Sequence, residues 1–384
     1  MARIGAEHPR LVTTALGITQ TVGYGSSYYL PAVLAAPMAE GTGLPVVWVF
    51  AAFSLALSLS AIVGPWAGAR IDALGGRGVM ALSNLIFAAG LVTLALAQGP
   101  FLLFAGWAMV GIGMGMGLYE AAFSTLAGIY GREARGAITG VTLIGGFAST
   151  VGWPLSGILL ATWGWREACL VWAALHLCLS LPLHLALPDG TQAKPETTAP
   201  ERDGAPPSTF KLALLAFVFA SAWFTSTAMA AHLPALLQSA GASTAMAIAA
   251  GALIGPAQVA ARLAEFGLLR RVHPLLSARL ASILHPAAAL CLGLFGGPAA
   301  YAFALLHGAG NGILTVAKGT LPLALFGAAG YGQRLGWLNA PARVMQAAAP
   351  LLFGAALAAW GLSALWLTAA VGLASTLALF LLRR

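Results

Sequence analysis

Charged residues are scarce in this sequence. Asp, Glu, Lys and Arg make up 8% of its 384 residues, while 59% are hydrophobic; soluble domains carry roughly 25% charged residues. Cysteine is scarce too, and Cys169, Cys178 and Cys291 match no metal-binding spacing. HExxH, Walker-lysine and CxxC motifs are missing. The low content of charged residues excludes a soluble globular domain. The missing motifs mean that the sequence gives no sign of a catalytic metal site or of the other enzyme chemistries that these motifs support.

What the chain does have is long apolar runs. A membrane-spanning helix needs about 20 mostly apolar residues, and twelve segments reach that length. The sequence therefore predicts an all-α integral membrane protein with twelve transmembrane helices. The predicted spans are 11–36, 46–68, 78–98, 101–128, 137–161, 166–187, 210–236, 244–268, 275–296, 299–326, 334–359 and 362–382.

One long polar stretch divides these spans into two sets of six. Residues 188–209 contain five prolines and mixed charge, a composition that cannot pack a core. We expect a flexible cytoplasmic linker there, between an N-terminal bundle (1–187) and a C-terminal bundle (210–384).

The two predicted bundles are related by an internal repeat. Pro100 and Pro298, each preceded by glycine, lie 198 residues apart, and the same offset separates Glu120 from Lys318. Parallel six-helix repeats are typical of secondary transporters. Two lone charges of opposite sign therefore occupy equivalent places in the two halves.

Basic residues predict the orientation of the chain. Under the twelve-span topology, fifteen Lys and Arg lie on the side of both termini and only Arg166 lies on the other. Short cytoplasmic loops carry such an excess, so both termini are predicted to be cytoplasmic. This asymmetry also accounts for the net charge of +8 without a nucleic-acid partner.

The connection between the second and third spans carries a recognisable motif. Gly68 is followed four residues later by Asp72, and Arg77 follows a short glycine turn; Ala73 and Gly76 depart from the basic residues usual there. With twelve spans, a central linker and a repeat, the whole chain resembles the major facilitator superfamily. That resemblance implies a secondary transporter that works as a monomer in the bacterial inner membrane, with no cofactor and no enzyme activity. Gly68, Asp72 and Arg77 would form its cytoplasmic gate.

In that family the first, fourth, seventh and tenth helices line the central cavity, so the resemblance implies that Glu120 and Lys318 lie there. A charge inside a bilayer is costly and usually functional, and an apolar environment favours the protonated form of a carboxyl group. We therefore predict that Glu120 couples transport to protons and that Lys318 binds substrate. The alternative is a permanent Glu120–Lys318 ion pair that only joins the two halves.

Two arginines, Arg262 and Arg343, also lie inside predicted spans, away from the cytoplasmic surface. Arg262 precedes Arg270 by eight residues and resembles the substrate-binding arginine of monocarboxylate and oxalate–formate transporters, although Gln258 stands where eukaryotic members often have Asp. A guanidinium group can donate two parallel hydrogen bonds to a carboxylate. The alternative for Arg262 is an anchor or a bridge to Glu265. Arg343 is predicted to be a second anion contact or a gate residue.

Uncharged polar residues complete the predicted substrate site. Tyr24 and Tyr28 are one turn apart in the first span, and His307 and Asn311 are one turn apart in the tenth. Each pair could face a cavity and bind substrate. The tyrosines could instead belong to an interfacial aromatic belt, and His307 could make a hydrogen bond between helices.

The predicted function is proton-coupled transport of a small, carboxylate-like organic anion, with lipid, protons and the anion as partners. The alternative is a drug or toxic-metabolite:proton antiporter of the same superfamily. Such antiporters usually have an arginine four residues before a glycine in the fourth helix, whereas Trp107 precedes Gly111 here. A membrane-embedded enzyme is a third class, but the sequence has no recognisable nucleophile and base for it.

Overall fold

The computed structural model describes residues 3–188, 208–269, 272–328 and 330–382, and within these ranges every regular element is a helix. The chain forms two compact units. Unit 1 comprises Met1–Pro200 with Gly327–Ala340, and unit 2 comprises Glu201–Phe326 with Pro341–Arg384. Most of the predicted linker, residues 189–207, lies outside the described residues.

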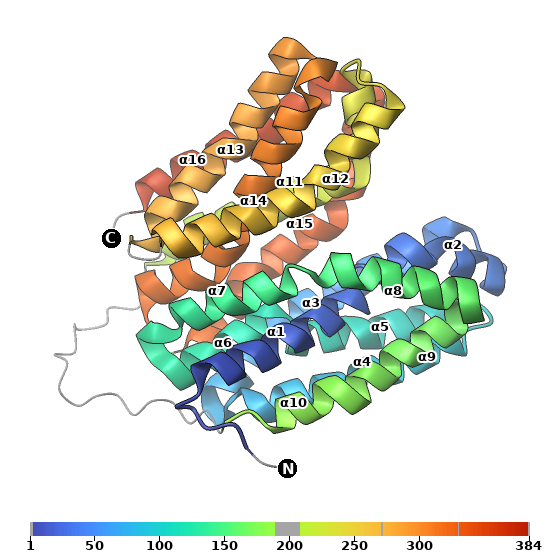
Figure 1. Cartoon of the computed structure of the whole chain (residues 1–384), viewed down its shortest axis with the longest axis vertical. Coiled ribbons are helices and arrows are strands. Elements are labelled where there is room, and N and C mark those ends of the chain that lie inside the picture. The colour runs from blue at the N-terminus through green and yellow to red at the C-terminus, as the bar shows by residue number, and fades with distance from the viewer. Residues whose placement is uncertain (1–2, 189–207, 270–271, 329, 383–384) are drawn as a thin grey trace. The chain divides into compact units, whose positions relative to one another are not determined.

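Unit 1 contains the first ten helices and the beginning of α15 (Figure 1). Three of its predicted spans are each divided into two helices, at residues 26–29, at residue 118 and at residues 146–147. Glycines precede or occupy all three breaks, and Pro31 follows the first one. The helices are α1 (Pro9–Gly25), α2 (Leu30–Thr42), α3 (Val46–Leu74), α4 (Gly76–Ala95), α5 (Pro100–Gly117), α6 (Tyr119–Tyr130), α7 (Ala134–Gly145), α8 (Ala148–Trp163), α9 (Trp165–Leu175) and α10 (Leu181–Leu185).

Unit 2 contains longer, mostly unbroken helices, the exception being a π-helical turn that extends α12 over Glu265–Leu269. Among the described residues of the whole chain, eight helical stretches are long and apolar enough to cross a membrane. The prediction of an all-α membrane protein is therefore confirmed. The helices of unit 2 are α11 (Thr209–Ser239), α12 (Thr244–Ala264), α13 (Pro274–Phe295), α14 (Ala300–Phe326), most of α15 (Tyr331–Trp360) and α16 (Leu365–Leu381).

Small residues allow α3 and α5 to pack closely in unit 1. Gly111 and Gly115 of α5 face the backbone of α3 at Ala56 and Ser60, and a Cβ atom at Gly115 would lie 2.9 Å from the Ser60 carbonyl oxygen. Transmembrane helices lack a hydrophobic force between them and depend on such close packing. The alternating glycines of the fourth span therefore serve packing.

The gate motif lies differently from the sequence prediction. The sequence predicts that the second span ends at residue 68, whereas α3 continues through Asp72 to Leu74. The turn itself is made at Gly75, whose φ of 80° lies in the left-handed region that favours glycine. Gly68 and Asp72 thus occupy the last two turns of a helix, and Arg77 lies in the first turn of α4.

A buried hydrogen-bond network joins three predicted spans within unit 1. Asn84 of α4 donates from Nδ2 to the Met80 carbonyl oxygen (2.8 Å), so its Oδ1 accepts from Nδ1 of His176 (3.0 Å). The other ring nitrogen of His176 lies 2.8 Å from Ser26 Oγ. His184 contacts the same amide nitrogen, at 2.6 Å from its Nδ1. A neutral set of tautomers satisfies these groups, so we interpret the network as structural.

We expect Asn84→Leu to lower the stability of the protein. The change keeps the side-chain size but removes the amide oxygen and the amide nitrogen, which leaves polar atoms of His176 and His184 buried without that partner. An unmade buried hydrogen bond costs about 1–3 kcal/mol, so the apparent melting temperature in detergent should fall by a few degrees. Thr93→Val, on the same helix, is the control because Thr93 bonds to its own helix. An unchanged melting temperature for Asn84→Leu would contradict the structural interpretation.

Candidate functional site

Two of the predicted substrate residues meet at one tryptophan in unit 2. Lys318 Nζ lies 3.7 Å from the ring centroid of Trp223, and Arg343 Cζ lies 5.1 Å from the same centroid. The side chains come from α14, α15 and α11. Lys318 is 7% exposed and Arg343 is 3% exposed. The indole face attracts cations through its quadrupole, so one ring stabilises two buried positive charges.

Gln346 adds a further donor to this group, which we call the Trp223 cluster: Trp223, Lys318, Arg343 and Gln346. Arg343 Nη1 donates to Gln346 Oε1 at 3.1 Å. Because arginine can only donate, this bond fixes the orientation of the amide. Gln346 is fully buried, and its Nε2 has no hydrogen-bond partner among the described residues. The cluster therefore offers an N–H group in addition to its two cations.

Arg262 lies elsewhere in unit 2, on α12. It is 4% exposed, and its Nε donates to the carbonyl oxygen of Gly312 on α14 at 3.3 Å. Its Nη2 donates to Gln258 Oε1, also at 3.3 Å. Gln258, the residue that departs from the eukaryotic pattern, thus orients the guanidinium group from one turn away. These contacts support the anchoring role for Arg262 that the sequence left open.

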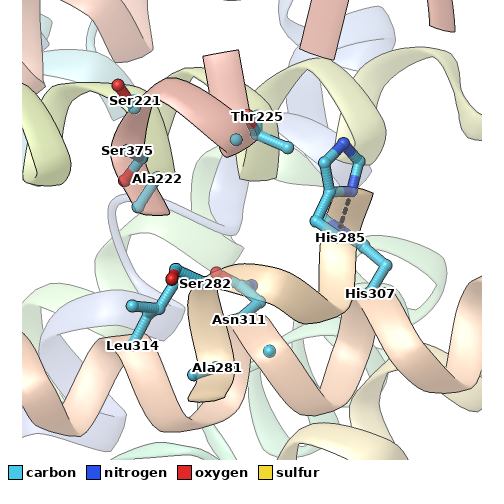
Figure 2. A pocket seen from close by; sticks show the side chains of 12 residues that line it. Ser221, Ala222, Thr225, Ala281, Ser282, His285, His307, Asn311, Leu314 and Ser375 are labelled. Carbon is cyan, nitrogen blue, oxygen red and sulfur yellow. Dashed lines mark hydrogen bonds between the residues drawn. The ribbon is translucent and has the colours of Figure 1, made fainter. Parts of the chain in front are cut away.

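His307 and Asn311 line a pocket inside unit 2 (Figure 2). Nδ1 of His307 lies 3.0 Å from Nδ1 of His285 on α13, which is the bond between helices that the sequence offered as the alternative role for His307. The histidine pair lies at one side of the pocket in this view, with Ser221 and Ser375 at the other.

In unit 1, the predicted tyrosines form an aromatic group near the break in the fourth span. The ring of Tyr24 lies 4.7 Å from that of Tyr119 and 6.1 Å from that of Tyr28. Tyr119 is the residue before Glu120, which lies in the first turn of α6 and is half-buried. A helix N-terminus stabilises negative charge.

Asp72, a residue of the predicted gate motif, accepts hydrogen bonds from the beginning of α15, which belongs to the same unit. Its Oδ1 accepts from the Gly332 amide at 2.8 Å, and its Oδ2 accepts from the Gln333 amide at 3.0 Å. The first amides of a helix lack partners within the helix, so a carboxylate satisfies them well. Gly68 allows this approach, because a Cβ atom there would collide with the Gly332 carbonyl oxygen.

We expect Asp72→Ala to loosen the start of α15. Losing a capping carboxylate costs about 0.5–2 kcal/mol, so amide exchange at Gly332 and Gln333 should become faster by about 2- to 30-fold. Hydrogen–deuterium exchange with mass spectrometry measures this directly. Glu40→Ala, which removes an exposed carboxylate of α2, should leave exchange there unchanged. Equal exchange in Asp72→Ala and the parent protein would rule out a capping role.

Three residues at these sites were missed in the sequence. His285 and Gln346 could have been found, since a polar residue in an apolar span is itself a signal, and Gln346 lies three residues after Arg343 on one helical face. Trp223 could not have been found, because the chain has 11 tryptophans and the sequence does not show which one contacts Lys318 and Arg343. Glu120 and Lys318 belong to different units, so their predicted pairing stays a prediction.

Comparison with known proteins identifies the family. The family model of the Major Facilitator Superfamily matches residues 16–301. An uncharacterized 38 kDa protein of Thermoproteus tenax is 34% identical over 164 residues, which are 42% of this chain and 43% of that protein. Human monocarboxylate transporter 14 is 31% identical over 129 residues, 33% of this chain and 25% of the transporter. The chain thus matches less than half the length of either relative.

Solved structures of the same fold cover nearly the whole chain. The human organic anion transporter MFSD10 (TETRAN) superimposes with a TM-score of 0.73 at 18% identity, covering 97% of this chain and 99% of that one. The proton:xylose symporter XylE gives 0.75 at 13% identity, covering 97% and 95%. At these identities the likeness concerns the fold alone. The chain belongs to the Major Facilitator Superfamily, and it is a multi-pass membrane transporter with the twelve-helix fold rather than an enzyme.

Proposed function

We propose that this transporter couples proton movement to the transport of a small, carboxylate-like organic anion by alternating access. The Trp223 cluster is the observation that carries the proposal. Lys318 and Arg343 are both buried and both held against one indole ring, and the buried amide of Gln346 adds a donor.

Burial of like charges explains why an anion is the expected ligand. Moving a cation out of water costs several kcal/mol unless opposite charge or hydrogen bonds compensate it. An indole ring compensates part of that cost, about 2 kcal/mol for a desolvated cation. A carboxylate would compensate more, because it accepts charge-assisted hydrogen bonds from ammonium, guanidinium and amide groups together.

The relatives support the same class of substrate without establishing it. One curated relative is named a monocarboxylate transporter, and one solved structure of the same fold is named an organic anion transporter. Two others are named proton symporters, of xylose and of fucose. For proton coupling in this chain we propose Glu120, because it is a lone carboxyl group within a predicted span.

The proposed setting follows from the same sequence features. We propose that the protein works as a monomer in the bacterial inner membrane, with both termini in the cytoplasm. The excess of Lys and Arg on one predicted side of the membrane supports this orientation.

Counterflow in proteoliposomes tests the proposed function. Vesicles with purified protein are loaded with unlabelled acetate, lactate, pyruvate or oxalate, and the uptake of the labelled compound is followed. We expect transient accumulation of at least one carboxylate, and a pH gradient should drive its net transport. Tetraphenylphosphonium serves as the second arm. Counterflow of this cation without that of any carboxylate would favour the drug antiporter and overturn the proposal.

A further inference from the structure

The pocket around His285 and His307 is separate from the Trp223 cluster. It lies among α11, α13, α14 and α16 within unit 2, and its cavity volume is about 30 Å³. On α11, Ser221 and Thr225 line it and are one turn apart. Trp223 lies between them in sequence, and at 3.6 residues per turn it projects from the opposite face. One helix therefore carries the pocket on one face and the cation-binding indole on the other.

The histidine pair determines what the pocket can bind. A neutral imidazole has one N–H group and one bare nitrogen. With the two Nδ1 atoms 3.0 Å apart, one neutral ring donates from Nδ1 and keeps a bare Nε2, while the other accepts at Nδ1 and carries N–H at Nε2. The pair thus has one donor and one acceptor left. Nε2 of His285, a residue only 8% exposed, has no hydrogen-bond partner among the described residues.

The rest of the lining is uncharged and combines the hydroxyl groups of serine and threonine and one amide with alanine, glycine and leucine. None of the twelve described residues that line the pocket is Asp, Glu, Lys or Arg. An anion would lack a cation there, and an ammonium group would lack a carboxylate. Hydroxyl and amide groups of Ser221, Thr225, Asn311 and Ser375 surround the space instead. A buried polar atom without a partner, such as His285 Nε2, is costly, so this uncharged lining favours a ligand that hydrogen-bonds without charge.

We propose that this histidine pocket is a second ligand site, which binds a small uncharged molecule bearing hydroxyl groups, such as a diol. A hydroxyl group donates and accepts at once, so it fits both remaining nitrogens of the histidine pair and the surrounding Ser, Thr and Asn side chains. A bound diol would bridge α11 to α13 and α14. It would stabilise unit 2 by mass action, independently of an anion at the Trp223 cluster.

Nitrogen NMR of the purified full-length protein, labelled with ¹⁵N-histidine, tests this site. Ethylene glycol is titrated, and His285→Phe and His307→Phe assign the signals. We expect a saturable shift of the His285 and His307 resonances. His176 and His184, whose network is already satisfied, are the internal control and should not shift. Sodium acetate and tetramethylammonium chloride, added in parallel, should leave all four residues unchanged.

Asn311→Leu removes the pocket's amide and should weaken ethylene glycol binding by at least about tenfold. An unchanged signal from His232, which lies in α11 of the same unit, shows that the variant is folded. If Asn311→Leu does not fold, Thr225→Val, which removes a hydroxyl group from the pocket, takes its place in the same measurement. A shift with acetate or tetramethylammonium alone would overturn the uncharged class of ligand. A shift that grows linearly without saturation, or one that Asn311→Leu leaves unaltered, would show a pocket that holds only water.

Discussion

Lys318→Met is expected to weaken carboxylate binding by at least about 30-fold. Methionine keeps a flexible apolar chain against Trp223 but removes the ammonium group. Losing one partner of a buried charged interaction costs about 2–5 kcal/mol, and 1.4 kcal/mol corresponds to a factor of ten. Binding of a radiolabelled carboxylate to purified protein measures the effect, once counterflow has identified which carboxylate is recognised.

Lys211→Met is the matched control for this substitution. It makes the same chemical change in the first turn of α11, where Lys211 is half-buried. Carboxylate binding should be unchanged in that variant. Lys318→Arg, which retains the positive charge, should keep part of the affinity. If Lys318→Met binds the carboxylate as well as the parent protein does, the Trp223 cluster is a structural element and not the anion site.

The helices of this protein could be predicted from apolar length, because a bilayer imposes that length on any span. The breaks in three spans could not be placed. Glycine and proline indicate that a break is tolerated, as at Pro31, but the neighbouring helices decide whether it forms. At Leu118 the backbone is extended, with φ of −83° and ψ of −166°, directly after the glycines that pack against α3.

The internal repeat also predicts where a polar contact between helices lies in each half. Asn84 and Ser282 are 198 residues apart, the offset that relates the two halves. In unit 1 Asn84 bonds to His176, and in unit 2 Ser282 accepts a hydrogen bond from Thr376 of α16 at 3.0 Å. Each half thus places a polar bridge between its third and its sixth predicted span. The partners differ in kind, so the repeat predicts the place of the bridge but not its chemistry.

The candidate site was predictable only in part, for a physical reason. A lone charge in an apolar span is conspicuous, which is why Lys318 and Arg343 were found. Their partner was not, because contacts between helices depend on rotation and depth that a sequence does not contain. The same limit explains why the sequence did not show that Asn311 lines a pocket together with His285; the assignment of Asn311 to the substrate stays a prediction.

Glu120→Gln is expected to retain carboxylate binding and exchange while losing transport driven by a pH gradient. Glutamine resembles the protonated carboxyl group in shape and hydrogen bonding but cannot release a proton. If Glu120 carries the coupled proton, counterflow should stay within about twofold of the parent protein, whereas gradient-driven accumulation should disappear. Both quantities can be measured in one preparation of proteoliposomes, with and without an imposed pH gradient.

Glu133→Gln is the control for Glu120→Gln, since Glu133 is exposed in the short helix that follows α6. It should accumulate the carboxylate normally. Intact accumulation in Glu120→Gln would refute the proton-coupling role. Loss of folded protein would instead favour the static ion pair with Lys318, and the exchanged pair Glu120→Lys with Lys318→Glu should then recover folding. A bilayer-embedded carboxyl group that carries protons must become neutral in each cycle, whereas one that only pairs must stay charged. Glutamine separates these two roles because it is permanently neutral.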